Sequence, residues 1–192
     1  MEVTPPDIRT GGLPRVFWVY LAGAMLVAAG FADFSLISFH FAQASTVSST
    51  LIPVFYAVAM GVGGIGSLVF GRLFDRFGIS VLIPLTILSA LFAPLVFLGG
   101  FWAALIGVVL WGLGIGVHES IIPAAVAPMV PAQRRASAYG LFTAGYGIFW
   151  FLGSALIGIL YGVSLPLVIA FSLVAELAAI PLFVVVSRKP AQ

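Results

Sequence analysis

The chain has 192 residues, of which 62% are hydrophobic and only 7% are charged, and its net charge is +2. Its mean hydropathy is +1.22. Ordinary soluble domains carry about 25% charged residues, so these few charges are too sparse to cover a water-facing surface. A soluble fold is therefore excluded, and the composition indicates a protein that crosses a membrane several times. The sequence contains no cysteine, which excludes disulfides and cysteine-ligated metal sites.

Six apolar stretches are long enough to cross a bilayer core of about 30 Å, which takes about 20 residues of helix. Short polar or glycine-containing segments separate them. Pro53 and Pro166 stand where the second and sixth helices are expected to begin, a position that suits a residue without an N–H group. The predicted fold class is an all-α membrane protein with six transmembrane helices, at 16–41, 52–70, 81–98, 102–126, 138–161 and 165–186.

The eight basic residues form four pairs, and every pair lies on the same side of the six predicted helices. Because cytoplasmic loops retain Lys and Arg, this side and both termini are predicted to be cytoplasmic. We expect a cytoplasmic tail at 1–15, a transmembrane domain at 16–186 and a second cytoplasmic tail at 187–192, in a bacterial-type inner membrane. The pairs are Arg9 and Arg15, Arg72 and Arg76, Arg134 and Arg135, and Arg188 and Lys189.

Small residues recur at every fourth position in three of the predicted helices. Such ladders let helix backbones approach closely, which replaces the hydrophobic driving force that lipid does not supply. Residues 61–66 also spell G-x-G-x-x-G, but they lie within an apolar span rather than between a strand and a helix, so nucleotide binding is rejected. The ladders are Gly63, Ser67 and Gly71; Gly112, Gly116 and Ser120; and Ser154, Gly158 and Gly162.

Between the second and third predicted helices the chain reads Gly71-Arg72-Leu73-Phe74-Asp75-Arg76-Phe77-Gly78. This segment resembles the G-x-L-x-D-R-x-G signature of the major facilitator superfamily of secondary transporters, which occupies the same loop of a six-helix half. Residues 134–155 are similar to the eleventh helix of full-length members and its leading loop. Residues 30–33 and 118–120 resemble their seventh and tenth helices. The resemblance implies one C-terminal half of that fold and a gating role for Gly71, Arg72, Asp75, Arg76, Gly78, Arg134 and Arg135.

Full-length members of that family have two such halves, with the substrate bound between them near the midplane of the membrane. One half alone lacks the second wall of this cavity, and three interpretations follow. The chain is a half-size unit that forms a homodimer, a half that pairs with a separately encoded half, or a fragment. We adopt the homodimer hypothesis, because an axis that relates two similar halves can equally relate two identical ones.

Several ionisable side chains lie within the predicted spans, where an unpaired charge costs roughly 2.5–3.5 kcal/mol. The resemblance implies that the first and fourth helices line the cavity and that the sixth is peripheral, so Glu176 is expected to be structural. On helix one, Asp33 and His40 share a face and are expected to pair through water. On the fifth helix, a stripe of side chains at helical spacing either contacts substrate or packs against neighbouring helices; it consists of Tyr139, Thr143, Tyr146 and Trp150. The candidate pathway is Asp33, His40, His118, Glu119, Tyr139, Thr143, Tyr146 and Trp150.

The expected function is secondary active transport of a small solute by a homodimer of half-size units. A carboxylate removed from water exchanges a proton more readily near neutral pH, so Asp33 and Glu119 are expected to couple transport to protons. The expected partners are lipid, a solute and a second copy or separate half. No cofactor, metal or nucleic acid is implied, and no paired nucleophile and base indicates an enzyme. The alternative function is a non-transporting assembly or regulatory subunit.

Overall fold

The computed structural model describes residues 12–188, so Arg9, Lys189 and most of both predicted tails lie outside the described residues. The described part is helical and contains no strand. Its helices are α1 (Arg15–Gly30), α2 (Phe34–Gln43), α3 (Ile52–Phe77), α4 (Leu82–Ala90), α5 (Phe92–Leu98), α6 (Phe101–Ala124), α7 (Arg135–Val163) and α8 (Leu165–Ser187). The short 3-10 helices are η1 (Gly78–Val81), η2 (Ala127–Met129) and η3 (Ala132–Arg134).

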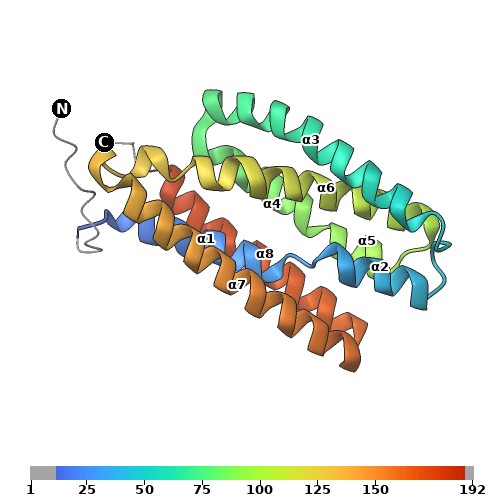
Figure 1. The fold of residues 1–192 in the computed structure, drawn as a ribbon. Helices are drawn as coiled ribbons and strands as arrows, with labels where there is room; N and C mark the ends of the chain where they lie inside the picture. Colours follow the sequence, from blue (N-terminus) through green and yellow to red (C-terminus); the bar gives the residue numbers. More distant parts are fainter. Residues whose placement is uncertain (1–11, 189–192) are drawn as a thin grey trace.

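Five helical stretches within 12–188 are long and apolar enough to cross a membrane. The second has 47 residues, about twice what one crossing needs. It folds back at η1, so that α4 and α5 return alongside α3 and α6 (Figure 1). The five stretches are Arg15–Gln43, Ile52–Leu98, Phe101–Met129, Ala132–Val163 and Leu165–Ser187.

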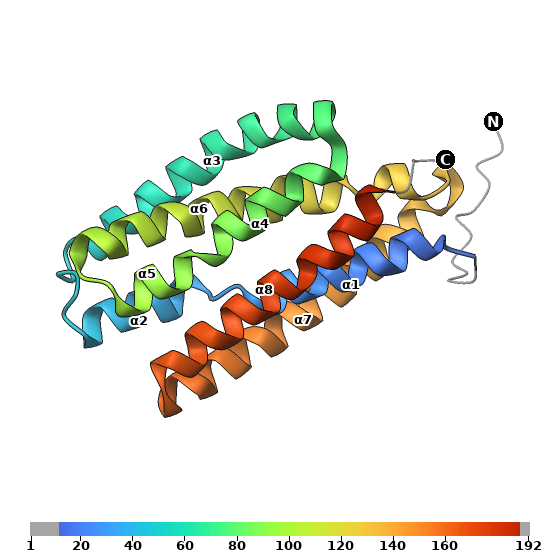
Figure 2. The same ribbon diagram turned by 180° about the vertical axis from the view of Figure 1, so that it is seen from behind.

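The helices form two groups. The α6 helix packs against α3, α4 and α5, whereas α1 packs against both α7 and α8. Figure 2 shows α8 along the back of α1, and Figure 1 shows α7 along its front. Contacts between α4 and α8 join the two groups. The resulting bundle has all its long helices roughly aligned, as a membrane domain requires.

Two predicted helices are interrupted. The expected span 16–41 breaks at residues 31–33, between α1 and α2, and the expected span 81–98 breaks at Leu91, between α4 and α5. The second break has a local cause, because Pro94 cannot donate the helical hydrogen bond to the carbonyl of Ala90. The first break follows from tertiary contacts of Phe31 and Asp33 that are described below.

The segment with the loop signature is mostly helical. The α3 helix continues to Phe77, seven residues beyond the predicted end at Phe70, so only the last glycine of the signature lies outside it. Gly78 has a φ angle of 63°, which side-chain-bearing residues rarely adopt, and its N–H donates to the carbonyl of Phe74. The signature therefore forms the last turns of a helix and its glycine cap.

Two of the three predicted small-residue ladders pack against each other, where α3 crosses α6. A Cβ atom on Gly63 would lie 2.7 Å from the carbonyl oxygen of Gly112, and one on Gly116 would lie 2.6 Å from that of Gly63. The Ser67 hydroxyl donates to the carbonyl of Gly63 at 2.8 Å. The third ladder is wrong as an internal contact, because Gly158 and Gly162 face open space. In its place, Gly153 lies against the backbone of Ala29.

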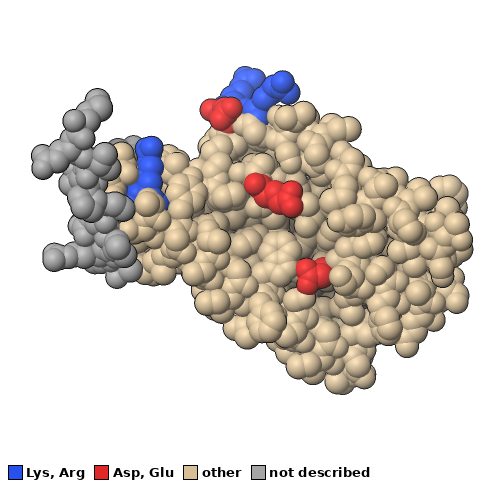
Figure 3. All heavy atoms as spheres, in the orientation of Figure 1, with Lys and Arg blue, Asp and Glu red and all other residues tan. Residues whose placement is uncertain are grey.

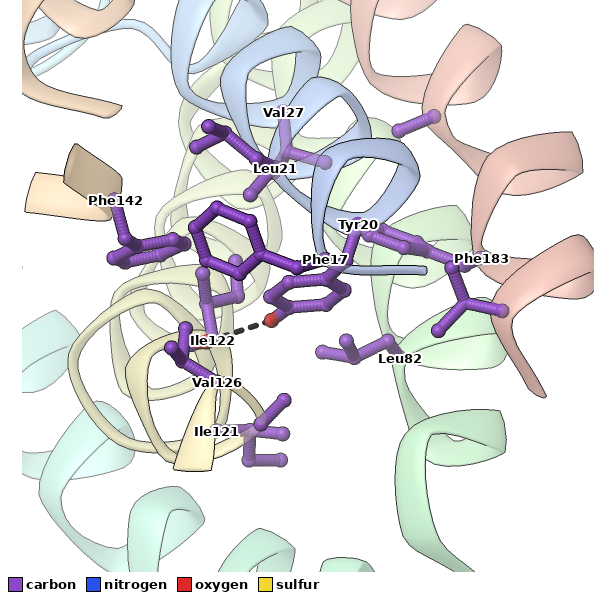
Figure 4. Packing of buried hydrophobic residues seen from close by; sticks show 14 of the residues in the cluster. Phe17, Tyr20, Leu21, Val27, Leu82, Ile121, Ile122, Val126, Phe142 and Phe183 are labelled. Atoms are coloured by element: carbon purple, nitrogen blue, oxygen red, sulfur yellow. Dashed lines mark hydrogen bonds between the residues drawn. The ribbon is translucent and has the colours of Figure 1, made fainter. Parts of the chain in front are cut away.

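The buried core at the arginine-bearing end of the bundle is built around the ring of Tyr20. Its hydroxyl donates to the Ile122 carbonyl at 2.6 Å, the contact drawn as a dashed line in Figure 4. The rings of Phe142 and Phe183 lie 6.3 and 5.8 Å from it, centre to centre. Tyr20 thus ties α1 to α6, α7 and α8, and its one polar atom is satisfied within the apolar interior.

The described basic residues all lie at one end of the bundle. That end carries the starts of α1 and α7 and the ends of α3 and α8, as Figure 1 shows. Figure 3 shows blue atoms confined to this end on the face it draws, while red atoms also lie in the uncharged surface away from it. The bundle therefore has one charged end, and the rest of it is apolar apart from isolated acidic side chains.

Candidate functional site

One face of α7 carries four polar or aromatic side chains that bond to other helices. Tyr146, Trp150, Ser154 and Tyr161 are spaced four, four and seven residues apart, and at 100° per residue they point within about 80° of one another. We call these four residues the α7 polar face. The rest of the helix is unusually open, since only 11% of its span is buried, compared with 39–56% for the others. The α7 helix is therefore held to the bundle along one line, by this polar face together with the buried residues Ala138, Phe142, Gly153 and Ile157.

Asp33 is the acid that this face binds most directly. Its carboxylate accepts a hydrogen bond from Trp150 Nε1 at 2.8 Å on one oxygen and from the Ser154 hydroxyl on the other. Asp33 also stands at the N-cap position of α2, but it makes no side-chain cap bond there. Both oxygens are committed to α7 instead, so the break between α1 and α2 is joined to α7 through one carboxylate.

The backbone at this break is held by aromatic side chains. The ring of Phe31 is fully buried, with centroids 5.7 Å from Trp111 and 6.0 Å from Trp150. Trp111 Nε1 donates to the Ala32 carbonyl at 2.8 Å. Because this carbonyl lies outside both helices, the indole supplies the partner that a buried backbone acceptor needs. The interrupted helix is thus a packed feature of the fold.

His118 and Glu119 face different surroundings, as expected for neighbours on a helix. His118 is buried, its Nδ1 lies 2.8 Å from the Tyr146 hydroxyl, and its ring lies 5.4 Å from that of Trp150. Glu119 is exposed. Tyr146 is near enough to Glu119 for the two to interact electrostatically. Trp150 therefore contacts both Asp33 and His118, which brings the two predicted acid-bearing helices together at α7.

Asp33 and His40, which were expected to pair through water, each contact a different part of α7 instead. His40 Nδ1 lies 3.0 Å from the Tyr161 hydroxyl, which itself donates to the Gln43 side chain at 3.1 Å. Tyr161 lies seven residues, or about 10 Å of helix, beyond Ser154. The two side chains thus bind α7 at different levels.

The remaining residues of the predicted stripe lie beside this face. Tyr139 is half-buried and packs against the core cluster around Tyr20, whereas Thr143 is exposed. The signature residues lie elsewhere, at the arginine-bearing end. Asp75 and Arg76 are exposed there, and the Arg76 guanidinium lies 5.2 Å from the centre of the Phe77 ring. The structure thus separates the predicted gating residues Asp75 and Arg76 from the pathway candidates.

Sequence reasoning missed two members of the α7 polar face. The sequence places Ser154 in a packing ladder and Tyr161 at the end of a predicted span. In the structure Ser154 bonds to Asp33, between α1 and α2, and Tyr161 bonds to His40 on α2. The signal was present, because both positions continue the helical face of Tyr146 and Trp150. Within 12–188, no group of three or more His, Cys, Asp or Glu side chains could hold a metal ion.

Comparisons with known proteins place the chain in a family. Residues 19–192 match the family described as Major Facilitator Superfamily. Uncharacterized proteins of Mycobacterium tuberculosis and Mycobacterium bovis are each 36% identical over 176 residues, which cover 92% of this chain and 43% of each relative. The chain thus spans less than half the length of these relatives. No solved structure matches it significantly. On the family match and the shared sequence, this multi-pass membrane protein belongs to the major facilitator superfamily.

Proposed function

We propose that the chain is one six-helix half of a secondary transporter that moves a small solute across a bacterial inner membrane. In this proposal Ile52–Leu98 crosses twice, through α3 and through α4–α5, which gives six spans and places both termini in the cytoplasm. The four described groups of arginines, at one end of the bundle, support this orientation because cytoplasmic loops retain them. The solute pathway runs along α7 past Asp33, Glu119, Tyr146 and Trp150.

The exposed carboxylate of Glu119 is the observation that carries the proposal. Glu119 lies five residues, or about 7.5 Å, before the end of α6 at Ala124, within the apolar stretch that ends at Met129. Facing lipid there, an ionised carboxylate would be unfavourable, by up to roughly 2.5–3.5 kcal/mol. Pro123 also cannot donate the helical hydrogen bond to the Glu119 carbonyl, which adds a second polar group at this point. Water or a protein partner must cover this surface, as in a transport cavity between two halves.

A second wall is proposed to be another copy of this chain, packed against α3 and α7. Both helices expose glycines that contact nothing in the single chain: Gly61, Gly64 and Gly71 on α3, and Gly140, Gly147, Gly158 and Gly162 on α7. Open small residues permit close helix approach, which makes these faces suited to a partner. A separately encoded half, or a longer chain such as the relatives have, would meet the same two faces.

Transport is tested with purified protein in proteoliposomes that contain a trapped pH indicator. We expect one or more solutes of a chemically diverse panel to dissipate an imposed pH gradient, and Asp33→Asn and Glu119→Gln to abolish this flux. Ser49→Ala, in an exposed loop, is the matched control. If no solute moves and both variants behave as the parent, the alternative of a non-transporting assembly or regulatory subunit is favoured.

The dimer and topology are tested with introduced thiols, which have no cysteine background. Ser45→Cys and Ser164→Cys are expected to react with an impermeant reagent in intact cells, and Ser187→Cys is not. In the proposed dimer the Asp75 carboxylate approaches the N-terminus of the partner's α7, where the helix dipole favours negative charge. An Asp75→Cys and Ser137→Cys pair should then crosslink between chains. Crosslinks confined to single chains would reject this geometry.

A further inference from the structure

Buried polar atoms without partners gather at one place inside the bundle. Within residues 12–188, the buried side-chain atoms that lack a hydrogen-bond partner come from α4, α6 and α8, and none lies on the α7 polar face. Native proteins pair nearly all such atoms, so a concentration of exceptions calls for an explanation. The atoms are Ser89 Oγ, His118 Nε2, Ser172 Oγ and both carboxylate oxygens of Glu176.

These atoms belong to one cluster. Ser89 and His118 line the same narrow space. The Ser89 hydroxyl is close enough to the Glu176 carboxylate to interact with it, but without a normal hydrogen bond. A Cβ atom on Gly30 would lie 2.8 Å from the Ser172 carbonyl oxygen and 3.0 Å from Glu176 Cγ. The tight crossing of α1 over α8 thus seals the carboxylate from the side of α1.

The carboxylate has no counter-charge at this depth. Glu176 is fully buried, and the nearest arginine on its own helix end, Arg188, follows it by twelve residues, or about 18 Å. The described basic residues all lie at the charged end of the bundle. An ionised carboxylate that is buried without a partner is strongly unfavourable, so the group needs either a bound cation or a proton.

The available space selects between these occupants. Ser89, which interacts with Glu176, and His118 line a narrow space that is too small for a water molecule, so a hydrated ion does not fit beside them. Within residues 12–188, no group of three or more His, Cys, Asp or Glu side chains could hold a bare metal cation. A proton satisfies the carboxyl group without requiring any room.

One titratable side chain lies within electrostatic reach of this carboxyl group: Tyr146, which forms a hydrogen-bonded pair with His118. His118 on α6 shares a hydrogen bond through Nδ1 with Tyr146 on α7, which leaves Nε2 unpaired in either tautomer. Tyr146 is within electrostatic reach of both Glu176 and the exposed Glu119. The cluster residues of α1, α4 and η1 contribute no titratable group. The pair therefore stands between the buried acid and the exposed one.

We propose that Glu176 is a proton-binding site inside the six-helix unit, and that the His118–Tyr146 pair connects it to the surface that carries Glu119. A proton on Glu176 leaves the cluster neutral, and in this proposal it is exchanged through the His118–Tyr146 pair. A part in coupling to transport rests on the proposed function. Binding of the proton rests only on the enclosure of Glu176 and its lack of a counter-charge.

The test is infrared spectroscopy of the 192-residue chain in lipid nanodiscs over a pH series. A protonated carboxyl group in an apolar site gives a C=O stretching band separate from that of a carboxylate. We expect such a band to persist above the pH at which exposed acids have ionised. The band should vanish in Glu176→Gln and remain in the matched control Glu119→Gln, whose side chain is exposed.

Two further measurements decide the outcome if Glu176→Gln folds poorly. His118→Gln leaves the acid in place and removes its exchange partner, so the band should persist while its shift on transfer to D2O becomes slower. Replacement of choline chloride by sodium chloride at constant pH should leave the band unchanged. Loss of the band in sodium would reveal a cation site and overturn the proposal, as would a D2O shift that His118→Gln does not slow. These results are independent of whether the protein transports a solute.

Discussion

The α3–α6 and α1–α7 contacts share one packing device but differ in everything around it. In each, a glycine lies against the backbone of an alanine on the other helix: Gly112 against Ala59, and Gly153 against Ala29. The α3–α6 contact also includes the ring pair of Phe55 and Phe101, and Ser67 there donates only to backbone carbonyls. The α1–α7 contact continues into the α7 polar face, whose bonds reach Asp33 and His118.

This difference separates a fixed contact from one that can rearrange. Backbone-to-backbone packing, in which Ser67 bonds only to backbone carbonyls, has no alternative partner to which it can switch, so it holds α3 and α6 as one unit. Hydrogen bonds from side chains can be exchanged for water or solute, because both provide donors and acceptors. We therefore expect α7 to move relative to the α3–α6 unit, and the predictions below test the two contacts in order of expected effect.

The largest effect is expected at the α3–α6 contact. Gly112→Ala would place a Cβ atom only 2.8 Å from Ala59 Cα. The two helix backbones must move apart to relieve this clash. Overpacking of this kind should cost about 3 kcal/mol of folding free energy. Thermal unfolding in detergent measures it. Gly64→Ala is the control, because its Cβ would meet nothing within 4 Å, and it should be neutral or stabilising by about 0.5 kcal/mol.

An intermediate effect is expected at the α7 polar face. Trp150→Phe keeps the ring but removes the donor to Asp33, and Asp33→Asn removes the charge that strengthens this bond. A double-mutant cycle should give a coupling energy of about 1–2 kcal/mol, in the range for hydrogen bonds to charged groups. Additive losses would mean that the bond contributes no stability. Asp33→Asn should also stop solute flux.

Sequence patterning was sufficient for an all-helical membrane domain and for the residues of one of the two contacts. Apolar runs indicated the membrane-spanning stretches, and the four-residue spacing of Gly63 with Ser67 and of Gly112 with Gly116 marked the residues that meet in the α3–α6 contact. Patterning failed where the chain departs from a regular helix. The break at 31–33 depends on Trp111, Trp150 and the carboxylate of Asp33 meeting in space, and no local sequence signal encodes that meeting.

The acids illustrate the same limit. Sequence alone marked Asp33, Glu119 and Glu176 as costly residues within apolar helices, but their neighbours decide what each does. Asp33 is fully bonded, Glu119 is exposed, and Glu176 is buried without a bond. The assignment of Glu176 to a peripheral, structural position rested on the helix order of the family. The close crossing of α1 over α8 at Gly30, which encloses the side chain, depends on tertiary packing.

The smallest effect is expected at the break between α1 and α2. Trp111→Phe should keep a six-membered aromatic ring beside Phe31, but it removes the hydrogen bond to the Ala32 carbonyl and leaves a small cavity in place of the pyrrole part of the indole. Loss of the bond should cost about 1 kcal/mol, because the carbonyl is left without a partner in an apolar setting, and the cavity adds to this cost. Hydrogen exchange should rise at the first amides of α2, which this carbonyl precedes. Trp102→Phe is the matched control, since Trp102 is 74% exposed, and its cost should stay within about 0.5 kcal/mol. Equal stability of the two variants, with unchanged exchange in α2, would mean that the break is held by ring packing alone and that Asp33 is free to move with α7.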